Sequence, residues 1–207
     1  MKETIRMPSD NESQACAELI YKSGPSLFRY MTNLPQEEVC EFLRYFFDKP
    51  SNPFSQDNIK IEECDGEIRG LLLCYAAKDI KELSRNMQKS FKELYKKLGF
   101  SKVFKMVRRM LINRFNPKLK KDEYLVSTLA VYESYRGQGI GKKLLEHAEV
   151  TAKLRGFNKL TISVESDNIR AREIYNKFGF IKKKEVVLPK RFNKYNLTGF
   201  IKMVKEI

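Results

Sequence analysis

The chain has 207 residues, of which 42% are hydrophobic and 12% aromatic, so it has enough apolar side chains for a sizeable core, which excludes disorder of the whole chain. Its formal net charge is +14, but residues 78–121 carry 15 Lys and Arg against three acidic residues, which leaves only +2 for the rest. The four cysteines form no Cys-x-x-Cys pair and there is one histidine, which argues against a zinc site, and no apolar run approaches the ~20 residues that span a bilayer. We therefore expect one cytoplasmic domain over residues 1–207, without a metal.

The N-terminal part predicts a strand and two helices. Residues 5–7 are a short strand candidate, and residues 9–12 supply capping side chains for a helix with apolar positions at Ala15, Leu19 and Ile20. A second helix is predicted over residues 36–47, with acidic residues in its first turn.

A β-hairpin is predicted next. Two apolar stretches, residues 59–64 and 68–75, flank Asp65-Gly66, a dipeptide that is typical of a tight turn between antiparallel strands.

The basic segment, residues 78–121, has apolar residues three or four positions apart on both sides of Gly99, which predicts a helical hairpin broken near that glycine. The simplest interpretation is an amphipathic insertion that covers the fold with its apolar face. Two alternatives stay open: weak contact with an anionic membrane surface, or with an acidic partner such as RNA or an acidic protein. No RNA-binding motif is visible, so we expect no sequence-specific binding of nucleic acid.

The most informative part of the chain is a glycine-rich turn, residues 134–144, between a predicted strand and a predicted helix. Residues 124–131 read as a largely buried strand, and the helix begins near Ile140 and ends before Gly156. Such a turn brings backbone N–H groups and a positive helix terminus to one point, which suits a pyrophosphate. The spacing of Gly137, Gly139 and Gly141 fits neither the nucleoside-triphosphate P-loop nor the dinucleotide fingerprint, and a tight loop that binds nothing is the remaining alternative.

Beyond the turn, the pattern predicts a strand over residues 160–164 and a helix over residues 168–177. Two last strands are predicted over residues 180–187 and 200–204. Together these elements predict a mixed sheet.

Two motifs in this region resemble those of the GNAT superfamily of acyl-CoA-dependent N-acetyltransferases. The first is Arg136-Gly-Gln-Gly-Ile-Gly141, and the second is Asn168-x-x-Ala-x-x-x-Tyr175-x-x-x-Gly-Phe180. The resemblance is firm from about Tyr124 to Phe180 and does not explain the basic segment. It implies an α/β fold with a mixed, mainly antiparallel sheet, a splayed central parallel pair and flanking helices, with the basic helical insertion added.

The resemblance also implies the residues that bind acetyl-CoA, the acyl donor substrate. Main-chain groups of the first splayed strand would pair with the pantetheine arm, the glycine turn would hold the pyrophosphate, and the second motif would contact the cofactor from the other strand. These residues are Leu129, Ala130, Val131, Arg136, Gly137, Gln138, Gly139, Ile140, Gly141, Lys142, Asn168 and Tyr175. Tyr175 would protonate the departing thiolate, which a phenol can do at neutral pH, although its spacing also fits a core aromatic.

A general base is harder to assign, because residues 125–129 contain no carboxylate. Glu123 at the start of that strand and Glu165 after the second strand are the candidates. Most glutamates are exposed, so the alternative for both is a solvated surface acid.

The expected reaction is acetyl transfer from acetyl-CoA to a primary amine, by direct attack in a ternary complex. No cysteine occupies an evident nucleophile position. The alternatives are an acyl-CoA-binding sensor without activity, or an RNA- or membrane-associated protein that uses the basic segment. The acceptor is not specified by the sequence.

Overall fold

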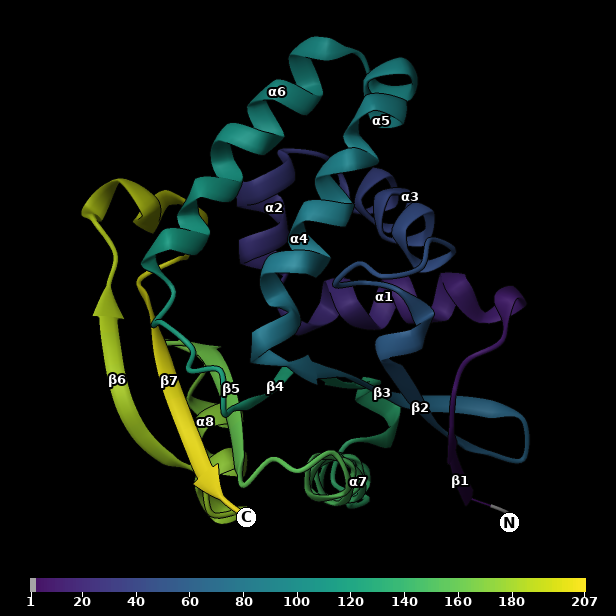
Figure 1. The fold of residues 1–207 in the computed structure, drawn as a ribbon, viewed down its shortest axis with the longest axis vertical. Coiled ribbons are helices and arrows are strands. Elements are labelled where there is room, and N and C mark those ends of the chain that lie inside the picture. Colours follow the sequence, from purple (N-terminus) through teal and green to yellow (C-terminus); the bar gives the residue numbers. More distant parts are fainter. Residues whose placement is uncertain (1–2) are drawn as a thin grey trace.

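The computed structural model describes residues 3–207, except for the side chains of residues 97, 98, 113 and 114. A seven-stranded sheet runs through the molecule in the order β1-β2-β3-β4-β5-β7-β6 (Figure 1). Its strands are β1 (Glu3–Arg6), β2 (Ile59–Cys64), β3 (Glu67–Ala76), β4 (Tyr124–Val131), β5 (Lys159–Glu165), β6 (Ile181–Val187) and β7 (Gly199–Glu206). Neighbouring strands are antiparallel except β4 and β5, so the predicted mixed sheet with one parallel pair is confirmed.

The parallel pair separates after three residues. Strand β4 pairs with β5 from Tyr124 to Val126, and from Thr128 onward it pairs only with β3. The register between β3 and β4 shifts at this point and leaves Ser127 as an extra residue, a β-bulge. The two strands therefore splay apart, as expected, and the bulge lies where the opening begins.

Helices cover both faces of the sheet (Figure 1). They are α1 (Ser13–Ser23), α2 (Pro25–Thr32), α3 (Gln36–Phe47), α4 (Ile80–Lys89), α5 (Phe91–Leu98), α6 (Phe100–Arg109), α7 (Ile140–Leu154) and α8 (Ile169–Lys177). Two buried clusters separate these helices: residues of α1 to α6 share one core with one face of the sheet, and residues of α7 and α8 share the other. Helix α7 is amphipathic, with Ile140, Leu144 and Leu145 almost fully buried, each stabilising the fold by about 2 kcal/mol.

Most predicted elements are confirmed. Helix α3 and strands β2 and β4 have the predicted bounds, and Asp65 and Gly66 adopt φ values of 51° and 86°, as a tight hairpin turn requires. The predicted break at Gly99 is also present, with φ of 81° between α5 and α6.

Two features differ from the prediction. Helix α2 was not expected, although Gly24-Pro25 is a helix-start signal with proline at the first position. The basic segment forms three helices and not a simple hairpin, because a further break occurs at Ser90 between α4 and α5.

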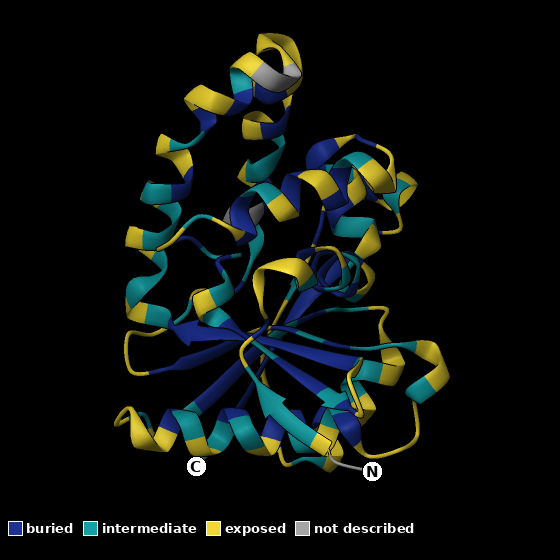
Figure 2. Cartoon of the chain, turned by 90° about the vertical axis from the view of Figure 1, so that its right-hand side faces the viewer, coloured by how far each residue is buried: buried dark blue, intermediate teal, exposed yellow. Residues whose placement is uncertain are grey.

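We call helices α4 to α6 the arm. Their tip lies farthest from the sheet (Figure 1), and their inner face packs on the body. Inner-face residues Met87, Phe91, Leu94, Val103 and Met106 belong to the same core as α1 to α3. The predicted amphipathic covering role of residues 78–121 is thus seen on this face, while the burial map shows the outer face largely exposed (Figure 2).

No helix in residues 3–207 is long and apolar enough to cross a membrane.

Candidate active site

The glycine turn joins β4 to α7 at the open end of the parallel pair. Gly137 and Gly139 have φ values of 86° and 79°, which only glycine adopts without strain, and a Cβ at either position would meet no atom within 4 Å. Glycine is therefore required at these two positions by the positive φ angle, and not by a lack of space for a side chain. Close approach is needed at Gly70 of β3 instead, where a Cβ would lie 3.0 Å from Ile140 Cγ2 and 3.1 Å from Ala130 O.

The first turn of α7 presents its N–H groups at this point. The first hydrogen bond within the helix runs from Lys143 N to Gly139 O at 3.1 Å. The backbone N–H groups of Ile140 to Lys142 come before it, so they have no acceptor within the helix. Lys142 is exposed, and Arg136 pairs with exposed Glu133 at 2.8 Å. The turn thus combines helix-terminal N–H groups, free space and nearby cations, which fits a pyrophosphate.

Helix α8 begins directly after β5, so it starts at the same end of the parallel pair. The side chain of Asn168 caps it, with Oδ1 accepting from Ala171 N at 3.1 Å. Tyr175, two turns later, is 7% exposed, and its ring lies edge-on to Phe180 with centroids 5.9 Å apart. Burial raises the pKa of the Tyr175 phenol above its ordinary value, so the hydroxyl keeps its proton at neutral pH.

A polar row follows one face of β5, and the sequence analysis, which predicted only that this segment is a strand, did not identify the row. Leu160, Ile162 and Val164 point into the core on the α7 and α8 side, so the alternating residues Thr161, Ser163 and Glu165 face the α1 to α6 side. Thr161 Oγ1, Ser163 Oγ and Glu165 Oε1 are buried without a hydrogen-bond partner among the described residues. The alternation of polar and apolar residues from position 160 to 165 is the signal that could have revealed the row.

Glu165 is the carboxylate at the open end of this row. Its Oε1 lies 3.6 Å from the Cβ position of Gly24, at the start of α2. Burial, followed by the negative charge of Asp167, raises the pKa of Glu165 from 4.5 to about 7, and the backbone amide of Leu27 opposes that rise. Glu165 is therefore not the solvated surface acid that its residue type suggests.

Glu123, the other carboxylate considered, lies at the closed end of the pair. It is 2% exposed and accepts two hydrogen bonds from Lys202 Nζ, at 2.7 and 2.8 Å, and one from Lys120 N at 2.9 Å. It is not a solvated surface acid either, because a buried ion pair occupies both of its oxygens.

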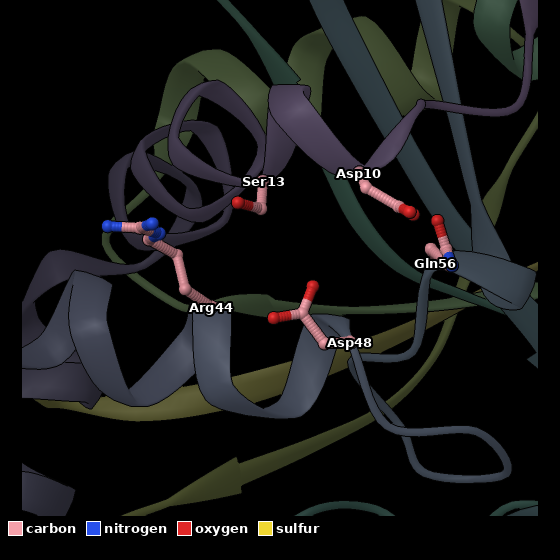
Figure 3. A pocket seen from close by; sticks show the side chains of 5 residues that line it. All are labelled: Asp10, Ser13, Arg44, Asp48 and Gln56. Carbon is pink, nitrogen blue, oxygen red and sulfur yellow. The ribbon is translucent and has the colours of Figure 1, made fainter.

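Two surface pockets lie away from these residues. One is formed by Asp10 and Ser13 near the start of α1 and by Arg44, Asp48 and Gln56; the carboxylates of Asp10 and Asp48 face the same space (Figure 3).

The other pocket lies at the end of α7, around Arg155 and Phe157. Neither pocket includes a residue of the glycine turn, Glu165 or Tyr175.

The structure thus brings most of the expected site residues to one end of the parallel pair. The glycine turn follows β4, and Glu165, Asn168 and Tyr175 follow β5, so both groups lie where ligands commonly bind in open α/β sheets. Glu123 is separated from them by the length of β4. In the described part of the chain, no cluster of His, Cys, Asp or Glu is arranged to hold a metal ion.

Residues 103–180 match the model of the Acetyltransferase (GNAT) family. Among curated proteins, mycothiol acetyltransferase of Jonesia denitrificans is 46% identical over 52 residues, covering 25% of this chain and 17% of that protein. The uncharacterized N-acetyltransferase YycN of Bacillus subtilis is 32% identical over 75 residues, covering 36% of this chain and 47% of that protein. The chain therefore spans less than half the length of these relatives.

Solved structures match over nearly the whole chain. An N-acetyltransferase from Staphylococcus aureus Mu50 has a TM-score of 0.71 and 18% identity, covering 97% of this chain and 99% of that one. A GNAT family acetyltransferase from Elizabethkingia anophelis with acetyl-CoA bound has a TM-score of 0.53 and 15% identity, covering 99% and 98%. At these identities the likeness defines the fold.

The fold is that of a GNAT acetyltransferase: a mixed sheet with one splayed parallel pair and a glycine turn at its open end. The family model matches residues 103–180 and so supports the resemblance to the GNAT superfamily in the part of the chain where both sequence motifs lie.

Proposed function

We propose that this chain is an N-acetyltransferase that transfers an acetyl group from acetyl-CoA to a primary amine. The observation that carries the proposal is the open end of the parallel pair, where a glycine turn lies on one side and a carboxyl with a pKa of about 7 lies on the other. One strand ends in a phosphate-binding element and the other in a group that accepts protons at neutral pH.

Acetyl-CoA, the acyl donor, would be held by two elements of this site. The glycine turn, from Arg136 to Lys142, would bind the pyrophosphate through main-chain N–H groups, and main-chain groups of Leu129 to Val131 would pair with the pantetheine arm along the part of β4 that β5 leaves unpaired. The Oδ1 of Asn168 is engaged in capping α8, so its contact with the donor would come through the amide Nδ2.

Glu165 would be the general base. When bound, acetyl-CoA supplies an activated acyl carbon: the amine nitrogen forms the new bond to it as the bond to sulfur breaks. A protonated amine must lose a proton to attack, and a carboxylate with a pKa of about 7 accepts one near neutral pH. Glu123 is not proposed for this role, because Lys202 and Lys120 N occupy its oxygens.

Tyr175 would be the general acid. Its buried phenol stays protonated at neutral pH and donates its proton to the departing sulfur, and solvent restores that proton. The protonated amine loses two protons, one before attack and one as the amide forms. Glu165 would accept each in turn and pass it to solvent, Tyr175 would give one proton to the thiolate and regain it from solvent, and one proton is released overall.

Direct attack on the donor is proposed, without an acyl-enzyme. The four cysteines are buried, and burial raises the pKa of the thiols of Cys16, Cys40 and Cys74, which keeps these three from forming the nucleophilic thiolate. We also propose that residues 1–207 form one domain, since the arm shares its core with α1 to α3.

Calorimetric titration with acetyl-CoA, followed by a thiol-release assay over a panel of primary amines, tests the proposal. We expect saturable binding and release of coenzyme A with at least one amine. Tight binding of acetyl-CoA without turnover on any amine would contradict the enzyme and indicate an acyl-CoA-binding sensor.

Replacing Tyr175 by Phe tests the general acid. The variant Tyr175→Phe should lower kcat by about a hundredfold and leave the Kd for acetyl-CoA nearly unchanged, because it removes only the proton donor. An unchanged kcat would remove Tyr175 from the mechanism.

A further inference from the structure

The outer face of α6 carries an apolar stripe that nothing in the described residues covers. Its members recur at helical spacing and continue one turn beyond the helix, with exposed fractions of 70% for Phe100, 52% for Phe104, 38% for Val107 and 56% for Leu111. The opposite, inward stripe contains Val103 and Met106, each 1% exposed. Helix α6 therefore has one apolar stripe for the body of the protein and a second stripe without a partner.

The rings in the outer stripe are ordered against one another. Phe100 stacks on Tyr95 of α5 with centroids 5.4 Å apart, and on Phe104 with centroids 5.9 Å apart and an interplanar angle of 13°. The turn at Gly99 brings α5 and α6 together so that these rings can meet. The stripe begins at the tip of the arm, where α5 and α6 meet (Figure 1), and runs along α6 to Leu111.

The charge around the stripe is strongly positive. Residues 78–121 carry 15 Lys and Arg and three acidic residues, and exposed Lys96, Lys105 and Arg108 lie on the two helices that bear the stripe. A short amphipathic helix with Phe and Leu on one face and Lys and Arg beside them is typical of a segment that lies in the surface of an anionic membrane.

We propose that the tip of the arm docks on an anionic lipid membrane, with the stripe Phe100, Phe104, Val107 and Leu111 in the headgroup region and the flanking cations on lipid phosphates. A second copy of this chain is a poorer occupant, because residues 78–121 carry a charge of +12 and two such segments repel each other. Single-stranded RNA is also a poorer occupant, since the ring faces are already stacked on one another and Val107 and Leu111 give bases nothing to stack on.

The arm also has a firm attachment to the body. Arg109 donates to Tyr30 O at 3.2 Å, and its guanidinium lies 5.8 Å from the centre of the Tyr30 ring on α2. Docking of the tip would therefore hold the whole molecule at the surface without inserting any helix across the bilayer.

Vesicle flotation of the full chain tests the proposal, with phosphatidylcholine vesicles compared with vesicles that also contain phosphatidylglycerol. We expect binding to the anionic vesicles in about 0.05 M salt, much weaker binding in about 0.5 M salt, and little binding to the neutral vesicles.

Two pairs of variants distinguish vesicle binding by the arm from nonspecific binding by other exposed apolar or basic residues. The variant Phe100→Ser/Phe104→Ser should weaken anionic-vesicle binding at least about tenfold, while Val150→Ser/Leu154→Ser, which alters exposed apolar residues on α7, should bind as the wild type does. Likewise Lys105→Glu/Arg108→Glu should weaken binding at least about tenfold, while Lys183→Glu/Lys184→Glu, with the same change in net charge on β6, should have a much smaller effect.

Three results would overturn the proposal. The first is an absence of vesicle binding at low salt, and the second is equal loss of binding in the arm variants and their controls. The third is a stripe variant that abolishes self-association or RNA binding in a protein that does not bind vesicles; this result would assign the surface to that other partner.

Discussion

The two ends of the parallel pair each hold a glutamate with a buried carboxylate oxygen, in opposite electrostatic surroundings. At the closed end, Glu123 is 2% exposed and its carboxylate is fully paired with Lys202 and Lys120 N. At the open end, the side chain of Glu165 is partly exposed, its Oε1 is buried without a hydrogen-bond partner among the described residues, and no cation is among the causes of its raised pKa. The same residue type therefore forms a buried ion pair at one end, and at the other it is the general base that we propose.

The comparison indicates that a cationic or hydrogen-bonding partner matters more than burial in deciding whether a buried carboxyl group is ionised. A buried charge with a cation and hydrogen bonds stays ionised and contributes to the fold, whereas a buried acid without them gains a proton more readily. Each of the following predictions changes one end and leaves the other intact.

The largest effect is expected from Glu165→Gln. This variant should lower kcat/KM by about 10²-fold to 10⁴-fold, because glutamine cannot accept the amine proton. The wild-type rate should rise with pH through about 7, as Glu165 loses its proton, and the variant should lack that rise.

The control for this change is Glu41→Gln, at an exposed position on α3 far from the site, which should leave the pH profile unchanged. A Glu165→Gln enzyme with wild-type kcat/KM and an unchanged profile would show that the base is another group.

The second prediction concerns the closed end. Glu123→Gln should lower the free energy of unfolding by about 3 kcal/mol, because it leaves Lys202 charged and buried without its carboxylate. The double variant Glu123→Gln/Lys202→Met should recover much of that loss. Denaturant unfolding measures both values, and kcat of the folded variants should stay near the wild-type value; a large loss of kcat in a stable Glu123→Gln protein would return Glu123 to the mechanism.

The third prediction is that Glu165 costs stability at alkaline pH. The pKa of Glu165 is raised in the folded state, so the folded protein binds more protons than the unfolded chain between about pH 4.5 and 7, and stability falls as pH rises through that window. Glu165→Gln should therefore be more stable than the wild type at pH 8, by at most about 3 kcal/mol, and similar to it at pH 4. Thermal unfolding across pH tests this; a variant that is less stable at pH 8 would contradict the unpaired environment.

The smallest effect is expected from Asp167→Asn, which removes the nearest negative charge that acts on Glu165. The pKa of Glu165 should fall, and the rising limb of the pH–rate profile should move to lower pH by less than about one unit, because burial is the larger cause and Asp167 is exposed. A shift to higher pH would show that Asp167 acts in some other way.

The parts of this site that could be predicted from sequence are those set by local backbone chemistry. The φ values of Gly137 and Gly139, the start of α7 and the Asn168 cap depend on residues close together in the chain, so their spacing carried the information. The proline at the start of α2 was a local signal of the same kind that the sequence analysis did not use.

The electrostatic state of the two glutamates could not be predicted in this way. Lys202 reaches Glu123 from 79 positions away, and Glu165 is desolvated by a loop at Gly24 that is distant in sequence. Whether a glutamate is paired, exposed or isolated is decided by tertiary packing, and the residue type alone favours exposure.

The shared core of the arm and the body makes the stability of each depend on the other. Helices α4 to α6 contribute Met87, Phe91, Leu94, Val103 and Met106 to the core that holds α1 to α3. Losing even one such side chain from a packed interior costs about 2 to 5 kcal/mol. Removing residues 78–121 would therefore expose the apolar residues of the body that these side chains cover. The arm is therefore a part of the interior of this fold, and deletion of residues 78–121 is expected to destabilise the whole protein.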